Sequence, residues 1–283
     1  MTTPQPSWRR RWLRVLGTGV GGTYLLLVLL ITVFQRELLF IPTTVPLVAA
    51  QQIAAGQGWH PWLNPGGGLI GWQFPSPGSA TGPVTGRVLI VHGNGGWALD
   101  RMDLGEAIHD ATGLEVYILE YPGYGSRAGS PSETSFLAAA DEAWVNLPHD
   151  RPAYVVSESL GTGVAAHLAQ KHPDQVAGLL MFVPYDRLAL VAQHHYPFLP
   201  AYFLLRDRFD PADWLAGYRG PVKIVIAGAD EIIPPIRGQK LYDGYQGPKT
   251  LQIIPRAHHN ETIGQSPGWW RSVLGFWETG GRP

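Results

Sequence analysis

Short apolar runs alternate with helical stretches from about residue 69 to the end of the chain, and no other feature restricts the fold as strongly. The run RVLIVHG is short and apolar and ends in glycine, which is typical of a strand buried on both faces. The predicted strands are residues 69–74 and the runs RVLIVHG, LEVYILEY, PAYVV, VAGLLMFVP, VKIVIAG and KTLQIIP. The predicted helices cover residues 97–111, 133–146, 160–171, 234–245 and 269–277. This alternation predicts an α/β fold, in which a mainly parallel sheet carries helices on both faces.

Size and composition narrow the class of protein. A chain of 283 residues is long enough for one large α/β domain. Its net charge of -1, together with the lack of a basic stripe, gives no reason to expect a nucleic-acid partner. The chain has no cysteine, which excludes disulfides, a cysteine nucleophile and a thiolate-bound metal.

The N-terminal region predicts a membrane anchor, because residues 15–34 carry no charged side chain. A helix of this length spans roughly 30 Å, the thickness of a bilayer hydrocarbon core. Arginines crowd only its N-terminal side, since Arg36 behind it is followed at once by Glu37. The arginines in front of it are Arg9, Arg10, Arg11 and Arg14. By the positive-inside rule, this asymmetry predicts a single-pass protein with a cytoplasmic N-terminus and an extracytoplasmic α/β domain, periplasmic in a Gram-negative bacterium.

Two other interpretations of residues 15–34 compete with the anchor. A cleaved signal peptide typically has a shorter apolar region with a small-residue cleavage site just behind it, whereas the nearest candidate here, residues 48–50, lies well downstream. A buried helix of a soluble protein is rarely apolar on all sides over this length. The uncleaved anchor is the favoured interpretation.

The chain is therefore expected to divide into a basic cytoplasmic tail (1–14), a transmembrane helix (15–34), a linker with the first elements (35–66) and an α/β domain (67–283). Residues 185–211 interrupt the alternation, because they are longer and more aromatic than a simple crossover helix. They are interpreted as a short lid over the strand ends or, alternatively, as an ordinary crossover with a proline-rich turn. The aromatic residues Tyr196, Phe198, Tyr202 and Phe203 favour an apolar acyl substrate, although core packing uses the same residue types.

The stretch YVVSESLGTGVA carries the most specific chemistry, because it approximates the G-x-S-x-G turn that presents a serine nucleophile between a strand and a helix. Strand and helix approach closely at such a turn, so the residues two positions to either side of the nucleophile must be small. Around Ser159 these residues are Ser157 and Gly161, whereas around Ser157 one of them is the branched Val155. We therefore predict that Ser159 is the nucleophile, and interpret Glu158 as the turn residue before it.

Two backbone amides are predicted to stabilise a tetrahedral oxyanion. Such a site needs N–H donors that are held in place before the reaction begins. Leu160 follows the nucleophile directly, and Asn94 lies in the loop HGNGG, where glycine lets the backbone approach the substrate. A nucleotide site is not expected at this loop, since the chain has no G-x-G-x-x-G and no P-loop lysine.

The acid and base partners are expected at the ends of later strands. Asp230 follows VKIVIAG directly and is the favoured carboxylate for orienting a base histidine, with Asp186 after LMFVPY as its rival. His258 and His259 both follow the last strand and both qualify as the base. A histidine pair also suggests a metal, but no acidic or histidine partner with ligand spacing lies nearby, so neither metal nor cofactor is predicted.

From about residue 35 to residue 277, the chain resembles the α/β-hydrolase superfamily, specifically its membrane-anchored serine hydrolases with a short lid. The motifs that carry the resemblance are FQRELLFIP, HGNGG, GYG followed by GSPSE, SLGTGVA and GADEIIP. The histidine of that family normally precedes asparagine in G-H-N-D, so aligning Asn260 implies that His259 is the base. His258 then replaces a glycine and Glu261 an aspartate. The resemblance implies an α/β-hydrolase fold with a Ser-Asp-His triad, from which Ser157 departs by replacing the first glycine of the serine motif.

The favoured hypothesis is a serine hydrolase that cleaves a carboxylic ester at the membrane surface, using Ser159, His259 and Asp230, with a small acyl substrate that is lipid-like. A serine peptidase of the aminopeptidase type is one alternative, but the sequence identifies no dedicated carboxylate that would hold a substrate terminus. A catalytically silent, membrane-tethered binding module is another. A haloperoxidase-like enzyme or a carbon–carbon hydrolase would use the same fold, because fold does not fix function.

Overall fold

An eight-stranded sheet forms the centre of the protein in the computed structural model, which describes residues 8–75 and 84–281 except for the side chains of residues 9–11 and 13–16. The strand order is β10-β9-β8-β7-β4-β6-β3-β2. All neighbours pair in parallel except β2 with β3 and β3 with β6. The strands are β2 (His60–Leu63), β3 (Leu69–Phe74), β4 (Arg87–Val91), β6 (Glu115–Leu119), β7 (Ala153–Glu158), β8 (Val176–Phe182), β9 (Val222–Ala227) and β10 (Lys249–Ile254). The predicted mainly parallel sheet is confirmed.

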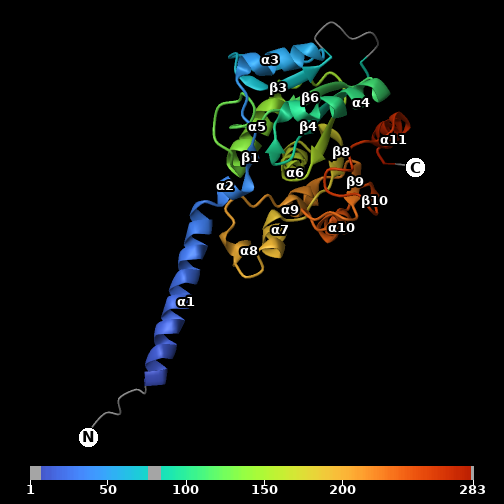
Figure 1. The fold of residues 1–283 in the computed structure, drawn as a ribbon. Helices are drawn as coiled ribbons and strands as arrows, with labels where there is room; N and C mark the ends of the chain where they lie inside the picture. The colour runs from blue at the N-terminus through green and yellow to red at the C-terminus, as the bar shows by residue number, and fades with distance from the viewer. Residues whose placement is uncertain (1–7, 76–83, 282–283) are drawn as a thin grey trace.

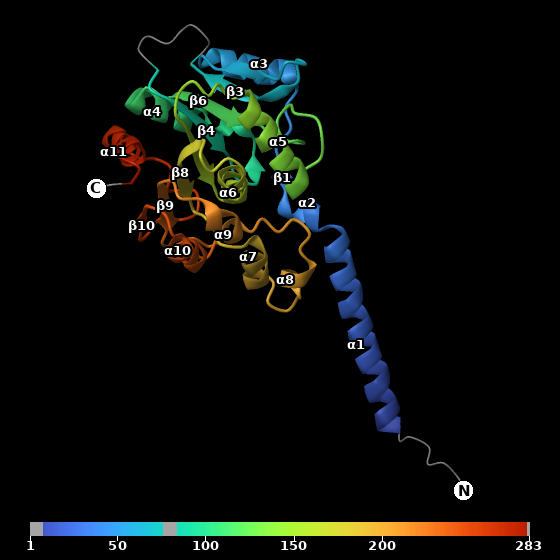
Figure 2. The same ribbon diagram turned by 180° about the vertical axis from the view of Figure 1, so that it is seen from behind.

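Helices cover both faces of this sheet (Figures 1 and 2). On one face lie α3 (Leu47–Gly56), α4 (Met102–Thr112) and α11 (Pro267–Glu278), and on the other α5 (Glu133–Asn146), α6 (Gly161–Lys171) and α10 (Pro235–Gly244). Strand β4 shows why its sequence is apolar throughout. Leu89 and Val91 belong to one buried core, whereas Val88 and Ile90 belong to the other. A strand packed on both faces has no position for a solvated side chain.

Strand β2 was not predicted. It is only four residues long, and it contains Pro61, which has no N–H to donate to a sheet. The structure places β2 at the edge of the sheet, paired with β3 alone. An edge strand has only one ladder to satisfy and therefore tolerates proline.

The N-terminal helix α1 (Trp8–Val33) projects from the body of the protein (Figure 1). It includes most of residues 15–34, for which a transmembrane helix was predicted. Within the part of the chain that the structure describes, no helix has both the length and the apolar character needed to cross a bilayer. The transmembrane helix is therefore not confirmed. Of the predicted basic tail, residues 1–7 and the arginine side chains lie outside the described residues.

The chain that follows α1 joins the body at once. After the short helix α2 (Gln35–Leu39), strand β1 (Ile41–Pro42) pairs in parallel with β5 (Gly95–Gly96), in the loop after β4. Thr44 then forms an isolated bridge with Gly125. The segment from residue 35 to residue 44, which the sequence suggested was part of a linker, is thus hydrogen-bonded to two loops of the domain.

Residues 185–211, which we call the lid segment, lie between β8 and β9 and contain α7 (Leu188–His195) and α8 (Ala201–Leu204). A further short helix, α9 (Pro211–Trp214), follows. Both views place α8 beside the end of α1 that joins the body (Figures 1 and 2). The hydroxyl of Tyr24 on α1 donates to the carbonyl oxygen of Phe198 at 2.9 Å, which links the two segments.

A buried aspartate fixes the C-terminal end of the lid segment. The guanidinium of Arg36 donates two hydrogen bonds to Asp207, at 2.7 and 3.0 Å, and the backbone amide of Glu133 donates a third at 2.8 Å. The side chain of Asp207 is only 2% exposed, so all of its charge is balanced within the protein. This contact raises the pKa of Arg36 above its ordinary value.

Replacing Asp207 with alanine is expected to lower the free energy of unfolding by about 2 kcal/mol, because hydrogen bonds to a charged group are lost and the backbone amide of Glu133 loses its acceptor. Urea unfolding followed by circular dichroism measures this loss. Asp213→Ala is the matched control, since Asp213 pairs with Arg187 at the surface and such a pair contributes at most about 1 kcal/mol. Equal losses in the two variants would contradict the role assigned to Asp207.

Candidate active site

The turn between β7 and α6 holds Ser159 in a conformation that is rare for a residue with a side chain. Its φ angle is 51°, in the left-handed region. The strain is held in place by the surrounding structure, since the amide of Ser159 donates to the carbonyl of Phe182 on β8 at 3.0 Å. A sharp strand-to-helix turn of this kind points the serine hydroxyl out of the sheet's carboxyl edge.

Small residues around Ser159 let α6 approach the sheet. A Cβ atom on Gly161 would overlap the carbonyl oxygen of Val91 and lie 2.9 Å from that of His92, so no larger residue fits there without moving backbone. Ser157, which departs from the usual glycine, is fully buried, and its hydroxyl lies 3.4 Å from the carbonyl oxygen of Leu180 on β8. The hydroxyl of Ser157 therefore lies within reach of a carbonyl of the neighbouring strand, and the site accommodates a hydroxymethyl group in place of glycine.

Three predicted side chains meet at this edge of the sheet. The Nε2 atom of His259 lies 3.0 Å from the Oγ atom of Ser159, and its Nδ1 atom lies 2.8 Å from the Oδ2 atom of Asp230. The other carboxylate oxygen of Asp230 accepts from the backbone amides of Ile232 and Ile233, at 2.9 and 2.8 Å. All three side chains are buried. The geometry allows a proton to pass from the serine to a histidine that the aspartate orients.

The rival residues do not join this arrangement. Asp186 does lie just after β8, but its carboxylate faces Arg237 at 3.3 Å, and no hydrogen bond joins it to His259. His258 points to the surface, where its Nδ1 atom lies 3.0 Å from Glu231, and this contact raises its pKa. Within the described part of the chain, no group of three or more histidine, aspartate or glutamate side chains is placed to hold a metal ion.

The two residues whose amides are predicted to bind the oxyanion, Asn94 and Leu160, line the same pocket as Ser159. Neither the amide of Asn94 nor that of Leu160 has a hydrogen-bond acceptor among the residues described. The loop that carries Asn94 is nevertheless fixed. Its side-chain amide donates to the carbonyl of Leu39 at 2.7 Å, and its carbonyl accepts from the hydroxyl of Tyr124 at 2.7 Å and the amide of Ile41 at 3.1 Å. The segment behind α1 therefore helps to position this loop.

Sequence comparison agrees with the fold. A family model described as alpha/beta hydrolase fold matches residues 86–224. An uncharacterised protein of Mycobacterium tuberculosis is 34% identical over 234 residues, which cover 80% of this chain and 81% of that protein. The chain belongs to the α/β-hydrolase superfamily. The superfamily expected from the sequence motifs is thus confirmed.

Two further proteins are similar to this member of the α/β-hydrolase superfamily. An uncharacterised membrane protein of Saccharomyces cerevisiae is 29% identical over 220 residues, 74% of each chain. Among solved structures, the esterase Pf2001 of Pyrococcus furiosus superposes with a TM-score of 0.59 at 15% identity, covering 85% of this chain and 96% of that chain. The structural similarity shows a shared α/β-hydrolase fold.

A second buried pair lies beneath the loop of Asn94 in this α/β-hydrolase. The Nε2 atom of His92 is 3.9 Å from the Oε1 atom of Glu120, and neither side chain reaches solvent. Burial lowers the pKa of His92 to about 3, helped by the charge of Arg101, and raises the pKa of Glu120 to about 7. His92 is therefore neutral, and its Nδ1 atom donates to the carbonyl of Gly93 at 2.8 Å, which stiffens the loop.

The raised pKa of Glu120 makes stability depend on pH. This carboxyl ionises near 4.5 in the unfolded chain and at about 7 in the folded one, so its stabilising contribution is complete below pH 4.5 and is lost as pH rises through 7. Glu120→Gln removes the titration. The free energy of unfolding of this variant, relative to the unsubstituted protein, is expected to rise by about 3 kcal/mol between about pH 4 and about pH 8. Urea titrations at both pH values measure the difference, and a constant difference would contradict the shift.

An ion pair at the serine turn was missed by the sequence analysis. Glu158, interpreted as a turn residue only, forms two hydrogen bonds with the guanidinium of Arg101, at 2.5 and 3.0 Å. Arg101 lies on the short helix η1 (Ala98–Arg101), just after the loop of Asn94. The sequence did carry a signal for this pair. Glu158 is an acidic residue within a stretch of small and apolar residues, and a buried charge needs a partner of opposite charge. The pair ties the serine turn to the segment that follows the loop.

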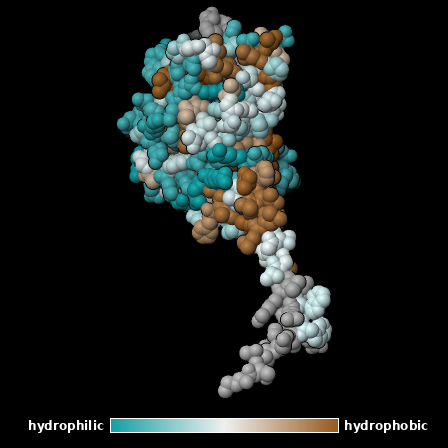
Figure 3. All heavy atoms as spheres, turned by 90° about the vertical axis from the view of Figure 1, so that its left-hand side faces the viewer, coloured by the Kyte–Doolittle hydropathy of each residue, from teal (hydrophilic) through white to brown (hydrophobic). Residues whose placement is uncertain are grey.

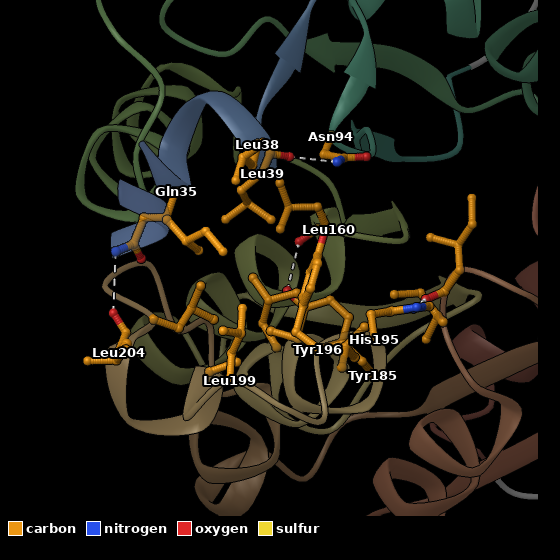
Figure 4. Close-up of a pocket in the computed structure, with 18 of the residues that line it drawn as sticks. Gln35, Leu38, Leu39, Asn94, Leu160, Tyr185, His195, Tyr196, Leu199 and Leu204 are labelled. Atoms are coloured by element: carbon orange, nitrogen blue, oxygen red, sulfur yellow. Dashed lines mark hydrogen bonds between the residues drawn. The ribbon is translucent and has the colours of Figure 1, made fainter. Parts of the chain in front are cut away.

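A pocket of about 450 Å³ opens beside Ser159 (Figure 4). In this view Leu38 and Leu39 of α2 lie across from Leu199 and Tyr196 of the lid segment. The residues that α1 and α2 contribute are Val28, Ile31, Thr32, Gln35, Leu38 and Leu39. No aspartate or glutamate lines the pocket among the residues described. The sequence analysis did not assign α1 to the site, because apolar side chains facing a bilayer and apolar side chains facing a pocket look alike in a sequence.

Proposed function

We propose that this protein is a serine hydrolase that cleaves carboxylic esters through an acyl-enzyme. The observation that carries the proposal is the hydrogen-bonded series from Ser159 through His259 to Asp230. His259 takes the proton as Ser159 Oγ attacks the ester carbonyl carbon. The carbonyl π electrons move to the oxygen, which becomes an oxyanion facing the amides of Asn94 and Leu160. Asp230 stabilises the imidazolium that forms.

The second half of the cycle follows from the same groups. The tetrahedral intermediate collapses as His259 gives its proton to the departing alcohol, and this leaves the acyl group on Ser159. Water then attacks the acyl-enzyme while His259 accepts its proton. The second tetrahedral intermediate collapses as His259 returns this proton to Ser159 Oγ, which releases the carboxylic acid and restores the free enzyme. Each preorganised oxyanion donor contributes roughly 3–4 kcal/mol to such a reaction. Asn94 is well suited to this role, because its side chain and carbonyl are both held by neighbouring segments.

The pocket favours an ester with an apolar acyl group over a peptide with a free amino terminus. An aminopeptidase binds the substrate ammonium with a carboxylate, and the residues that line the described pocket include no acidic side chain. Leucine, isoleucine and valine form most of the wall instead. Burial of apolar area stabilises a bound acyl chain by about 0.8 kcal/mol for each methylene group.

We further propose that α1 tethers the enzyme to a membrane, with the N-terminus cytoplasmic and the catalytic domain on the other side. The support is the uncharged segment 15–34 with four arginines in front of it and only Arg36, next to Glu37, behind it, and the yeast relative described as a membrane protein. Phe198 and Phe203 of the lid segment add to it, since they are 88% and 79% exposed beside α1. Large exposed aromatic side chains in one place typically mark a membrane or partner surface.

A fluorophosphonate probe tests the catalytic proposal on the full-length protein in detergent micelles. Labelling is expected for the unsubstituted protein and not for Ser159→Ala, whereas a protein that never labels would be a silent binding module. A panel of p-nitrophenyl esters and aminoacyl p-nitroanilides separates the two enzyme classes. Faster turnover of the anilides would overturn the ester proposal in favour of a peptidase. Extraction of native membranes with alkaline carbonate tests the tether, since release of the protein into the supernatant would contradict it.

A further inference from the structure

One face of α1 lines the pocket, and the other faces do not. Val28, Ile31 and Thr32 follow the i, i+3, i+4 spacing that places side chains on one side of a helix, and all three are half-buried pocket residues. Leu29 and Val33 alternate with them but are exposed and do not line the pocket. The helix that the sequence assigns to membrane anchoring therefore also builds a wall of the candidate active site.

This wall is held in a fixed position against the lid segment. Gln35, only 7% exposed at the junction of α1 and α2, donates to the carbonyl of Leu204 at 3.3 Å and accepts from the amide of Arg206 at 2.7 Å. Figure 4 shows the contact between Gln35 and Leu204 at the border of the pocket. The bond from Tyr24 to Phe198 lies farther along α1, so the helix contacts the lid segment over several turns. A wall fixed at both ends has a defined shape, which a specificity determinant requires.

The pocket continues into an apolar surface at the same place. Around the end of α1, hydrophobic side chains gather on the surface of the protein (Figure 3). The exposed hydrophobic residues of α1, α2 and the lid segment at this end include Val33, Phe34, Leu38, Tyr196, Phe198 and Phe203. Leu38 and Tyr196 belong both to this surface and to the pocket lining. Apolar side chains are therefore available to contact a hydrocarbon chain from the protein surface to Ser159.

We propose that α1 is the substrate-selecting wall of the pocket, and that the hydrocarbon chain of a membrane lipid ester lies along Val28 and Ile31 while its carbonyl group is held at Ser159. The inference rests on the proposed esterase function and adds the substrate class to it. From residue 35 back to residue 28, the helix supplies roughly 10 Å of wall. Val28 and Ile31 are specificity residues, because a side chain at either position determines how much of the acyl chain is accommodated.

The test compares tryptophan substitutions on the two sides of α1 in the full-length protein in detergent micelles. Val28→Trp and Ile31→Trp fill the pocket wall, whereas Leu29→Trp and Leu30→Trp place the same side chain at exposed positions that do not line the pocket. The readout is the ratio of kcat/KM for a p-nitrophenyl ester of a long chain to that of the acetyl ester. Each methylene group expelled from the pocket costs roughly fourfold, so this ratio is expected to fall at least about tenfold in the first pair. It is expected to stay within about twofold in the second pair.

A photocrosslinking arm gives an independent readout. A benzophenone amino acid is placed at position 31 or position 29, and Ser159 is then labelled with a long-chain alkyl fluorophosphonate. Irradiation is expected to join the alkyl chain to position 31 and not to position 29. Crosslinking at position 29 alone, or equal ester ratios in all four tryptophan variants, would overturn the inference. Failure of the proposed function is distinct, because it removes labelling of Ser159 from the unsubstituted protein before any wall variant is compared.

Discussion

Replacing Ser159 with alanine is expected to lower kcat for ester hydrolysis by roughly four to six orders of magnitude while the protein still folds. The Oγ atom of Ser159 is the group within hydrogen-bond distance of His259, at 3.0 Å, so the variant loses the nucleophile and keeps the base. The amides of Asn94 and Leu160 remain and leave a small residual rate for attack by water. Initial rates on short esters, with fluorophosphonate labelling as a second readout, measure the loss.

Because the backbone of Ser159 is strained, substitutions at this position are also expected to change the free energy of unfolding. Its φ angle of 51° is unfavourable for any residue with a Cβ atom and costs glycine nothing. Ser159→Gly is therefore expected to be as inactive as Ser159→Ala and to be more stable by about 1 kcal/mol. Ser157→Ala is the matched control, since that hydroxyl is buried against β8 and does not contact His259. If ester turnover survived in Ser159→Ala and disappeared in Ser157→Ala, Ser157 rather than Ser159 would be the nucleophile.

Asp230→Asn is expected to lower kcat/KM by about four orders of magnitude with little change in structure. The two backbone amides of Ile232 and Ile233 determine how the new side chain is oriented. They need an acceptor, so the amide oxygen takes the place of Oδ1 and the NH₂ group faces Nδ1 of His259. That nitrogen must then accept, which moves the imidazole proton to Nε2. In this tautomer His259 donates to Ser159 and is unable to take its proton.

The pH profile separates this explanation from a merely structural role of Asp230. A histidine held in the wrong tautomer recovers activity when hydroxide rather than the imidazole removes the serine proton, so the rate of Asp230→Asn is expected to keep rising at alkaline pH. Asp186→Asn is the control, because Asp186 faces Arg237 and does not touch the histidine. Its kcat/KM is expected to change less than about tenfold. A larger loss in Asp186→Asn than in Asp230→Asn would exchange the roles assigned to the two carboxylates.

The sheet was predictable because each central strand is apolar along its whole length, and such runs have few alternatives in a folded chain. The place of Ser159 at the strand-to-helix turn was predictable from a steric argument about its neighbours, and the space around Gly161 agrees with that argument. The position of Asp230 followed from its place directly after a strand. These features depend on local sequence, where a few adjacent residues decide the outcome.

Features that depend on distant contacts were not predictable. Strand β1 is two residues long, and its pairing with β5 joins positions more than fifty residues apart. The pair between Glu158 and Arg101 likewise depends on the fold that brings the end of β7 next to η1. Val28 and Ile31 carry no sequence signal that separates a pocket wall from a lipid-facing side. In each case the residue type is compatible with several environments, and only the three-dimensional arrangement selects one.

The pairing of β1 with β5 has a consequence for the freedom of the catalytic domain. A flexible connection of ten residues would let a tethered domain wander by roughly 15–20 Å. Here the chain leaves α1, turns through α2 and is hydrogen-bonded to the loop of Asn94 within about ten residues. The domain and the helix therefore move as one body. A surface that binds α1 therefore also fixes the direction in which the pocket opens. Only molecules that come into direct contact with the pocket opening then reach Ser159.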